Sequence, residues 1–263
     1  MLDLGFVLAG FLVGTIVGLT GVGGGSLMTP VLIFFFGVKP YLAVGTDLLF
    51  AAFTKLGGTV SYARQRIVPW RVVGLLSLGS LPAALVTLAV LRWVGPADAR
   101  VQSVMTGTLG VALLLTAAAM AYKAVRGKQL PRQLSAADEA RASRPRHWSL
   151  PVLLGAAIGA LVTLTSVGAG AIGVSVLLLL YPLLPLPRIV AADIAYAVPL
   201  TLVAGLGHAS LGSVDWPLLA KLLAGSLPGI WLGTRLTQYT PDRLVRSLLS
   251  ALLAWAGLKL VAL

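Results

Sequence analysis

Two carboxylates and one lysine lie inside long apolar stretches of the sequence, where charged side chains are rare. Asp47 and Asp193 each follow the start of an apolar segment by one or two helical turns, and Lys55 follows Asp47 by eight residues. Charged side chains inside a membrane are costly and commonly line ion or substrate pathways. A carboxylate there can exchange protons as its surroundings change, and a buried ammonium group can bind an anion. We therefore expect Asp47 and Asp193 to exchange a proton or bind an ion, and Lys55 to bind an anion.

A second interpretation of the two carboxylates stays open. If Asp47 and Asp193 lie in the first turns of their own helices, unpaired N–H groups and the helix dipole would favour them there for structural reasons. Lys55 is two turns and about 80° around the helix from Asp47, so a direct ion pair between them is not expected. Two other ionisable residues are interpreted as structural, Lys221 as reaching the membrane interface and His208 as packing.

Two glycine-rich breaks supply the rest of the expected site, "GVGGG" at 21–25 and "SVGAG" at 166–170. Backbone exposed by a break inside a membrane must be satisfied by protein, water or ligand, because lipid offers no hydrogen bonds. A helix that restarts after the break directs free N–H groups and partial positive charge at the site, which suits an anion. The residues expected to bind substrate are Thr20, Gly21, Gly23, Gly24, Gly25, Ser26, Lys55, Thr165, Ser166, Gly168 and Gly170. The alternative is that these small residues only permit close helix packing.

The composition indicates that membrane helices position these residues. Hydrophobic residues make up 58% of the 263 residues and charged residues only 11%, far from the averages of soluble globular chains. Apolar runs recur along the chain, and several exceed the roughly 20 residues that cross about 30 Å of hydrocarbon. We expect an all-α polytopic membrane protein. Because Met1, Leu2 and Asp3 provide no basic n-region, the first segment is expected to be retained and not cleaved as a signal peptide.

Hydropathy and helix breakers divide the chain into about 8 to 10 membrane segments. The ten segments expected are 4–20, 25–37, 41–64, 69–93, 97–123, 149–166, 170–182, 188–211, 216–237 and 243–262. Two of them, 25–37 and 170–182, hold about thirteen residues, or about 20 Å of helix, and fall short of the hydrocarbon thickness. Short segments after glycine breaks, at matching positions in two halves, mark the binding sites of many secondary transporters. These two segments are either re-entrant or full crossings.

The two halves of the chain resemble each other at an offset of 145 to 146 residues. "GSLP" occurs at 79–82 and again at 225–228, and Asp47 matches Asp193. Five segments in each half would invert the second copy relative to the first, which gives the inverted-topology repeat of many secondary transporters. Such transporters work by alternating access. We expect an N-terminal membrane repeat over 1–123, a basic loop over 124–148 and a C-terminal membrane repeat over 149–263.

The formal net charge of +12 is interpreted as a sign of membrane topology. The connection from residue 126 to residue 147 is long, polar and mostly basic. Placing it in the cytoplasm puts fourteen basic residues inside and four outside, in agreement with the positive-inside rule. We expect this loop to lie on the cytoplasmic side of the membrane and both termini on the opposite side. No aromatic residues interleave the charges, so no nucleic-acid partner is expected. The expected partners are a small-molecule anion and membrane lipid, with a homodimer left open.

Cofactors, metal ions and catalysis are not expected from the sequence. The chain has no cysteine and only two histidines, so it offers no disulfide or thiolate metal site and too few residues for a His-rich one. "GAGAIG" at 168–173 fits the dinucleotide fingerprint, but it leads into a leucine run and lacks the surrounding βαβ unit. No HExxH, G-x-S-x-G or paired His-Asp motif supports an intramembrane enzyme.

Several blocks resemble the TauE/SafE family of sulfite exporters, over nearly all of both halves apart from the basic loop. They are "GVGGGSLMTPVL" at 21–32, "AVGTDLL" at 43–49, "GHASLGSVDWPLL" at 207–219 and "LPGIWLGTRL" at 227–236. The resemblance implies a polytopic inner-membrane transporter for sulfite, sulfonates or related sulfur-containing anions. The sequence departs from the family pattern at Asp47 and Asp193, where a small hydroxyl residue would be expected, and in the second break, "SVGAG".

The residues and the resemblance together predict a secondary transporter that moves a small sulfur-containing anion across the inner membrane by alternating access. Two carboxylates near the site would repel an anion unless they are protonated or paired with a cation, so proton coupling reconciles them with the resemblance. The alternative is a proton- or cation-linked carrier of another small solute, in which Asp47 and Asp193 bind the ion or the substrate directly.

Overall fold

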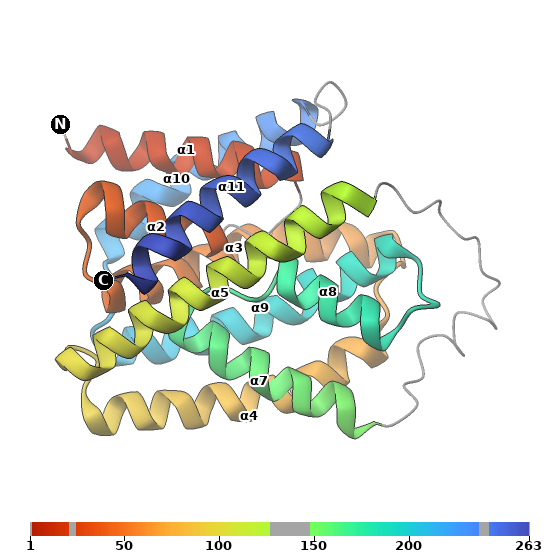
Figure 1. Cartoon of the computed structure of the whole chain (residues 1–263), viewed down its shortest axis with the longest axis horizontal. Helices are drawn as coiled ribbons and strands as arrows, with labels where there is room; N and C mark the ends of the chain where they lie inside the picture. Colours follow the sequence, from red (N-terminus) through yellow and green to blue (C-terminus); the bar gives the residue numbers. More distant parts are fainter. Residues whose placement is uncertain (1, 21–24, 127–147, 237–241, 263) are drawn as a thin grey trace.

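The structure is a computed structural model that describes residues 2–20, 25–126, 148–236 and 242–262 (Figure 1). All regular secondary structure in these ranges is helical. The helices are α1 (Leu2–Thr20), α2 (Gly25–Phe36), α3 (Pro40–Arg64), α4 (Trp70–Val94), α5 (Ala99–Arg126), α7 (Ser149–Thr165), α8 (Ala171–Leu180), α9 (Leu186–Ser210), α10 (Trp216–Leu236) and α11 (Asp242–Val261). Each coincides with one expected segment, and the largest difference is at α5, which runs to Arg126 instead of residue 123. The all-α class is confirmed.

The exterior of the bundle suits contact with lipid. Within the described residues, three helical stretches are long and apolar enough to span a membrane, namely α4, Ala99–Tyr122 of α5, and α9. Trp70, Trp148 and Trp216 are exposed at the starts of α4, α7 and α10. An indole ring at a helix end sits well at the level of the lipid headgroups. The chain is therefore a membrane protein, as its composition predicts.

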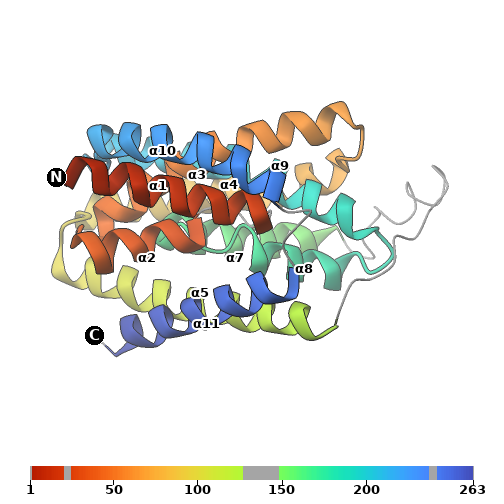
Figure 2. The ribbon, with the colours of Figure 1, turned by 90° about the horizontal axis from the view of Figure 1, so that it is seen from above.

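The helices pack in pairs that join the two halves of the chain. α1 packs along α10, α4 along α7, α5 along α11 and α3 along α9; Figure 2 shows the same bundle from above. α2, α4, α8 and α10 each pack against α3 or α9, so these two helices form the centre. Both carry long runs of buried residues. The central pair therefore holds Asp47, Lys55 and Asp193 away from the surface of the bundle.

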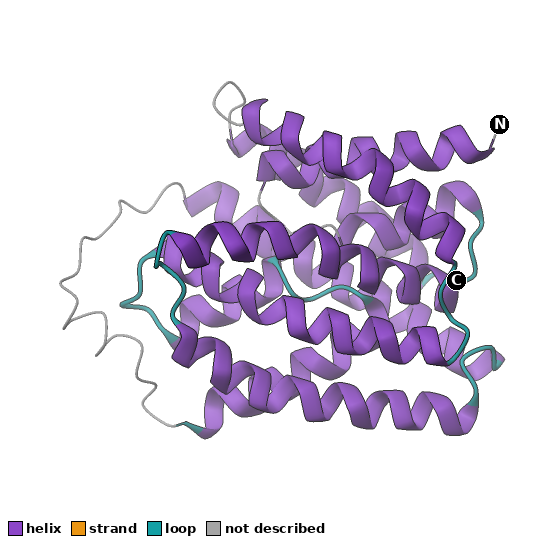
Figure 3. Cartoon of the chain, turned by 180° about the vertical axis from the view of Figure 1, so that it is seen from behind, coloured by secondary structure: helices purple, strands orange, loops and turns teal. Residues whose placement is uncertain are grey.

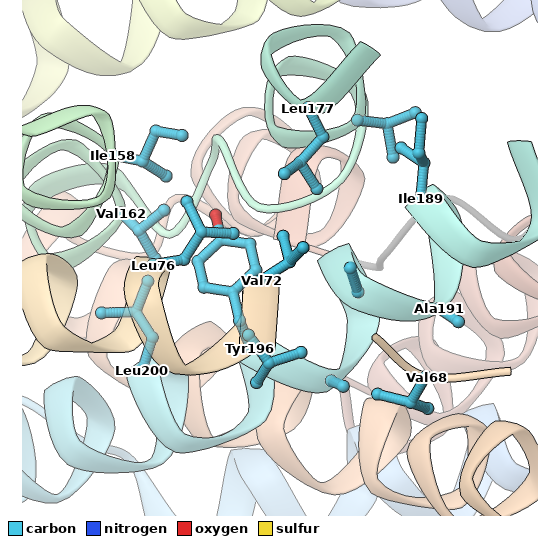
Figure 4. Packing of buried hydrophobic residues seen from close by; sticks show 14 of the residues in the cluster. Val68, Val72, Leu76, Ile158, Val162, Leu177, Ile189, Ala191, Tyr196 and Leu200 are labelled. Atoms are coloured by element: carbon cyan, nitrogen blue, oxygen red, sulfur yellow. The ribbon is translucent and has the colours of Figure 1, made fainter. Parts of the chain in front are cut away.

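A tightly packed apolar cluster fixes α8 and α9 relative to α4 and α7. Leu76 of α4, Val162 of α7, Leu177 of α8 and Tyr196 of α9 are all buried in it (Figure 4). Because lipid is as apolar as these side chains, close packing and not exclusion of water holds the helices together. The cluster provides a rigid support for the nearby break between α7 and α8.

Glycines allow the α1–α10 and α4–α7 pairs to approach closely. Gly14 of α1 lies against the backbone of Ser226 in α10, and Gly159 of α7 lies in the same way against Ser80 in α4. A methyl group on either glycine would overlap a carbonyl oxygen of the partner helix. Small residues at such interfaces allow membrane helices to pack closely in the absence of a hydrophobic driving force. These pairs depend on the missing side chains.

Gly14→Ala is expected to lower the melting temperature of the purified protein, because the added Cβ would overlap the Ser226 carbonyl oxygen. Overpacking of this kind costs about 1–3 kcal/mol. Gly74→Ala in α4 is the matched control, since nothing lies within 4 Å of its added methyl group and alanine favours the helix. Equal melting temperatures for the two variants would contradict the close approach of α1 and α10.

Two short helices begin inside the bundle. α2 has 12 residues and α8 has 10, too few to cross about 30 Å of hydrocarbon at 1.5 Å per residue. Each starts near the middle of the bundle, and the two run to opposite ends (Figure 1, Figure 2). The expectation of two short segments after the glycine-rich stretches is confirmed. Their starts bring helix N-termini to the interior.

Candidate functional site

The connection between α7 and α8 crosses the middle of the bundle. It comprises residues 166–170 and appears as a central loop in Figure 3. Three of its residues have positive φ angles, Ser166 at 59°, Gly168 at 133° and Gly170 at 141°. At the last two angles only glycine is free of strain. Gly168 and Gly170 therefore break the helix, which argues against the alternative that they serve only helix packing.

Thr165 and Ser166 at the end of α7 have different surroundings. Thr165 Oγ1 donates to Leu161 O at 2.7 Å and accepts from the Val167 N–H at 3.1 Å, so its hydroxyl group holds the turn. The Ser166 side chain is buried beside the carboxyl group of Asp47. Its hydroxyl group has no hydrogen-bond partner in the described part of the chain. Ser166 thus keeps hydrogen-bonding capacity at the centre of the molecule.

Asp47 lies fully buried on α3, against the second turn of α2. The Thr29 hydroxyl group, in the second turn of α2, donates to Asp47 Oδ2 at 2.5 Å. The other oxygen, Oδ1, is buried and has no hydrogen-bond partner within the described ranges. Ser26 lies three residues before Thr29, on the same face of α2, and its buried hydroxyl group is also without a partner among the described residues. The start of α2 therefore gathers polar groups that are incompletely hydrogen-bonded.

Asp193 takes the corresponding place at the start of α8. It is buried on α9, and its Oδ1 packs directly against Gly173 in the first turn of α8. A methyl group at position 173 would overlap this oxygen. The Gly173 N–H donates to Gly168 O at 2.9 Å, which joins the first turn of α8 to the preceding break. The missing side chain at position 173 makes room for the carboxylate.

Neither carboxylate lies in the first turn of its own helix, so that interpretation is wrong. Each is the eighth residue, Asp47 in α3 counted from Pro40 and Asp193 in α9 counted from Leu186. The first turns of α3 and α9 hold no acidic residue. Both carboxylates lie instead against early turns of α2 and α8. The sequence does not reveal this arrangement because the contacts join different helices.

Lys55 links the two carboxylates to the helix break. Its side chain is only 6% exposed, and its Nζ donates to Ala169 O in the α7–α8 connection at 3.0 Å. Its charge attracts both Asp47 and Asp193. Opposite charges attract more strongly in a protein interior than in water, so Lys55 compensates part of the negative charge. With all three groups ionised, one positive and two negative charges leave a net charge of −1.

The structure brings together most of the expected site residues that it describes. Those that it places around the α7–α8 connection are Asp47, Lys55, Ser166, Gly168, Gly170 and Asp193. Gly25 begins α2, and Ser26 follows it in the first turn. Four other expected positions, the side chain of Thr20 together with Gly21, Gly23 and Gly24, lie outside the residues that the structure describes.

Three residues at the site were not expected from the sequence, namely Thr29, Gly173 and Tyr196. Thr29 and Gly173 each follow a glycine-rich stretch within about one helical turn, a spacing that could have pointed to them. Tyr196 is fully buried one turn after Asp193, and its hydroxyl group has no partner among the described residues. Its match in the first half is Phe50, also fully buried, so the second half carries an additional hydroxyl group.

His208 packs between helices and does not face the carboxylates directly. Its Nε2–H donates to Thr163 O of α7 at 2.9 Å, and its Cβ lies against Gly45 of α3. Its Nδ1 has no partner in the described ranges. Among the described residues, no three His, Cys, Asp or Glu side chains lie close enough to hold a metal ion.

Comparison with known proteins identifies relatives over almost the full length. The model of the family described as "Sulfite exporter TauE/SafE" matches residues 6–260. The chain is 35% identical to the probable membrane transporter protein YjnA of Bacillus subtilis (strain 168), over 99% of this chain and 100% of that protein. It is 27% identical to the probable membrane transporter protein YdhB of the same organism, over 97% of this chain and 98% of that protein. No solved structure gives a significant match.

Proposed function

This chain belongs to the TauE/SafE sulfite exporter family of membrane transporters, and we propose that it moves small sulfur-containing anions across the bacterial inner membrane. Transport is secondary, by alternating access, and is coupled to protons. The chain acts as a carrier and not as an enzyme. The observation that carries the proposal is the buried lysine at the break: Lys55 Nζ donates to Ala169 O beside the start of α8.

The surroundings of Lys55 suit a small oxyanion. An ammonium group has three donors, and Ala169 O accepts one of them, which leaves donors for a ligand. Ser166 and Ser26 offer buried hydroxyl groups without partners in the described part of the chain. The starts of α2 and α8 add partial positive charge. Oxyanions of sulfur present several acceptor oxygens and a negative charge, which match these donors.

Inverted repeats are part of this proposal, with a membrane repeat over 1–123, a cytoplasmic loop over 124–148 and a second repeat over 149–263. The helix pairs support it, because a two-fold axis that exchanges the halves would relate α1–α10 to α7–α4 and would pair α3 with α9 and α5 with α11. The matching glycine contacts, Gly14 with Ser226 and Gly159 with Ser80, support it as well. Rocking of one repeat against the other would open the central site to alternate sides.

We place both termini in the periplasm and the basic loop in the cytoplasm. The ends of the described chain lie at one end of the bundle, while α5 ends and α7 begins at the other (Figure 1). The loop that joins α5 to α7 is basic, and positive loops remain in the cytoplasm. This arrangement agrees with the fourteen-to-four division of basic residues derived from the sequence.

The charges at the site support proton coupling. With Asp47, Asp193 and Lys55 ionised, the net charge is −1, and a monovalent anion would bring it to −2 in a buried place. Negative charges that close repel each other in a medium of low dielectric constant. A proton that enters with the anion removes this cost. Asp47 and Asp193 are the acceptors that we assign to it.

Purified protein is expected to be stabilised selectively by a sulfur oxyanion, since a ligand that binds only the native state must raise its stability. Sulfite, thiosulfate, sulfoacetate and taurine would be compared with acetate and chloride by thermal unfolding in detergent. A ligand at about 100 times its Kd adds about 2.7 kcal/mol to the free energy of unfolding. If none of the sulfur compounds raises the melting temperature above the effect of acetate and chloride, the assigned substrate class is wrong.

The second candidate function is a proton- or cation-linked carrier of another solute. The observation that favours it is the presence of two buried carboxylates, Asp47 and Asp193, one at the start of each short helix. In such a carrier the carboxylates bind the ion or the substrate directly. Stabilisation only by cations or by uncharged solutes, lost on Asp47→Asn, would support this function in place of the first.

A further inference from the structure

We propose that the Asp47 carboxylate and the substrate anion compete for the start of α2, so that the anion binds there only after Asp47 has taken up a proton. The inference rests on the proposed function, because it assumes an anionic substrate. It adds a physical mechanism by which proton and anion move together. Asp47 acts as an internal substitute for the substrate when no substrate is bound.

The carboxylate occupies the place that a substrate anion would prefer. The start of a helix attracts negative charge through its dipole and its free N–H groups. Asp47 brings such a charge to the first two turns of α2, because it accepts a hydrogen bond from the Thr29 hydroxyl group, in the second turn, at 2.5 Å. Two negative groups cannot share this place without strong repulsion. Binding of the anion therefore requires the carboxylate to lose its charge or to move away.

More polar groups lie near Asp47 than its carboxylate uses. Ser26 and Ser166 are at least nine-tenths buried, and neither hydroxyl group has a hydrogen-bond partner among the described residues. Asp47 Oδ1 is likewise buried and without a partner there. Buried polar atoms without partners are costly, commonly by about 1–3 kcal/mol each. Ser166 lies beside the Asp47 carboxylate, and Ser26 lies one turn before Thr29, which binds that carboxylate. Their presence points to a ligand that uses them in another state of the transporter.

The exchange balances in charge. A proton from solvent forms an O–H bond with a carboxylate oxygen of Asp47, which changes its charge from −1 to 0. A monovalent anion then brings −1 to the start of α2, so the net charge of the site stays at −1. Lys55, which donates to Ala169 O and attracts both carboxylates, contributes the single positive charge in this sum. The neutral carboxyl group can still hydrogen-bond to Thr29.

Few groups near Asp47 could account for a pH dependence of anion binding in its place. Lys55 shares α3 with it, while Thr29 of α2 and Ser166 of the α7–α8 connection do not ionise in the working range. From α9, Asp193 acts on Asp47 through Lys55, Tyr196 adjoins Asp193, and His208 packs against Gly45 of α3. Just before α10, the Asp215 N–H donates to Thr46 Oγ1, next to Asp47. Asp193 and His208 are therefore the two groups whose titration could imitate that of Asp47, and Asp47→Asn distinguishes both from Asp47 because it removes only the Asp47 carboxylate.

The test measures anion affinity against pH in detergent, using whichever of sulfite, thiosulfate and sulfoacetate stabilises the wild type. The proteins compared are the wild type, Asp47→Asn, His208→Gln and Asp98→Asn. Asp98 is exposed and its carboxylate accepts from the Arg100 N–H, so Asp98→Asn removes a carboxylate remote from the site. Calorimetry of the wild type in two buffers with different ionisation enthalpies counts the protons taken up, and it does not depend on any variant folding.

The expected result is a wild-type affinity that falls about tenfold for each pH unit over the range in which Asp47 is ionised, with about one proton taken up. Asp47→Asn should bind as the wild type does at low pH, without this slope, while His208→Gln and Asp98→Asn keep it. Sulfite itself also gains protons in this pH range. The readout is therefore the difference in slope between the wild type and each variant. Equal slopes in the wild type and Asp47→Asn, or a slope lost only in His208→Gln, would overturn the competition.

Two further outcomes separate this inference from the proposed function. If Asp47→Asn folds but no longer binds the anion, Asp47 is a ligand and not a competitor; the inference fails while anion transport stands. If the wild type binds the anion without taking up protons, the inference fails in the same way. If no sulfur anion stabilises the wild type at any pH, both the inference and the proposed substrate class fail.

Discussion

Lys55→Met is expected to reduce the affinity for a sulfur anion at least about a hundredfold, because it removes the buried positive charge at the site. Removal of one member of a buried charged pair costs about 2–5 kcal/mol, and about 2.7 kcal/mol corresponds to a hundredfold. Methionine keeps the length of the apolar stem but neither the charge nor the hydrogen bond to Ala169 O. The measurement is the ligand concentration that gives half-maximal thermal stabilisation.

Lys39→Met is the matched control for this variant. Lys39 precedes the same helix, α3, but is exposed and makes no side-chain capping bond. Its loss removes the same charge from the protein without touching the site. We expect Lys39→Met to bind the anion as the wild type does. If Lys55→Met and Lys39→Met bind the anion with equal affinity, Lys55 serves only to hold the α7–α8 connection.

Gly173→Ala is expected to abolish transport and to lower stability by about 1–3 kcal/mol, the usual cost of overpacking. The added methyl group would overlap Asp193 Oδ1 and push the carboxylate away from the start of α8. Uptake or efflux of the anion in proteoliposomes measures the first effect, and thermal unfolding measures the second. Because alanine is the better helix former, helix propensity alone predicts a small gain in stability.

Gly57→Ala on α3 provides the comparison. It is the same substitution within a helix, and nothing lies within 4 Å of the added methyl group. Unchanged transport is expected for this variant. If Gly173→Ala transports as well as Gly57→Ala does, the contact between Asp193 and α8 has no part in the mechanism, and the assignment of Asp193 to coupling would have to be abandoned.

The positions of the helices could be predicted from the sequence because they depend on local properties. Apolar runs, glycine breaks and prolines mark the ends of each segment, and the short segments 25–37 and 170–182 became α2 and α8 with small changes at their ends. A glycine that breaks a helix and a glycine that permits close packing look alike in sequence. Only the positive φ angles of Gly168 and Gly170 show that these two break the helix.

The surroundings of the charged residues could not be predicted in the same way. Asp47 and Lys55 were expected from their rarity in apolar segments, yet the hydrogen bond from Thr29 joins α2 to α3, and the one to Ala169 joins α3 to the other half of the chain. Such contacts depend on how helices pack. The sequence does show that Phe50 in the first half is replaced by Tyr196 in the second. Only the burial of both side chains shows that this replacement adds a hydroxyl group to the interior.

The exchange of partners between the halves has a consequence for biosynthesis. The face of α1 that carries Gly10, Gly14 and Gly18 packs along α10, whose first residue is Trp216. This glycine face therefore has no partner in the bilayer until most of the chain has been synthesised. At about 5–20 residues per second the delay from Thr20 to Trp216 is roughly 10 to 40 s. During that time the exposed glycine face of α1 is open to wrong partners. The N-terminal half therefore cannot complete its own packing before the C-terminal half is inserted.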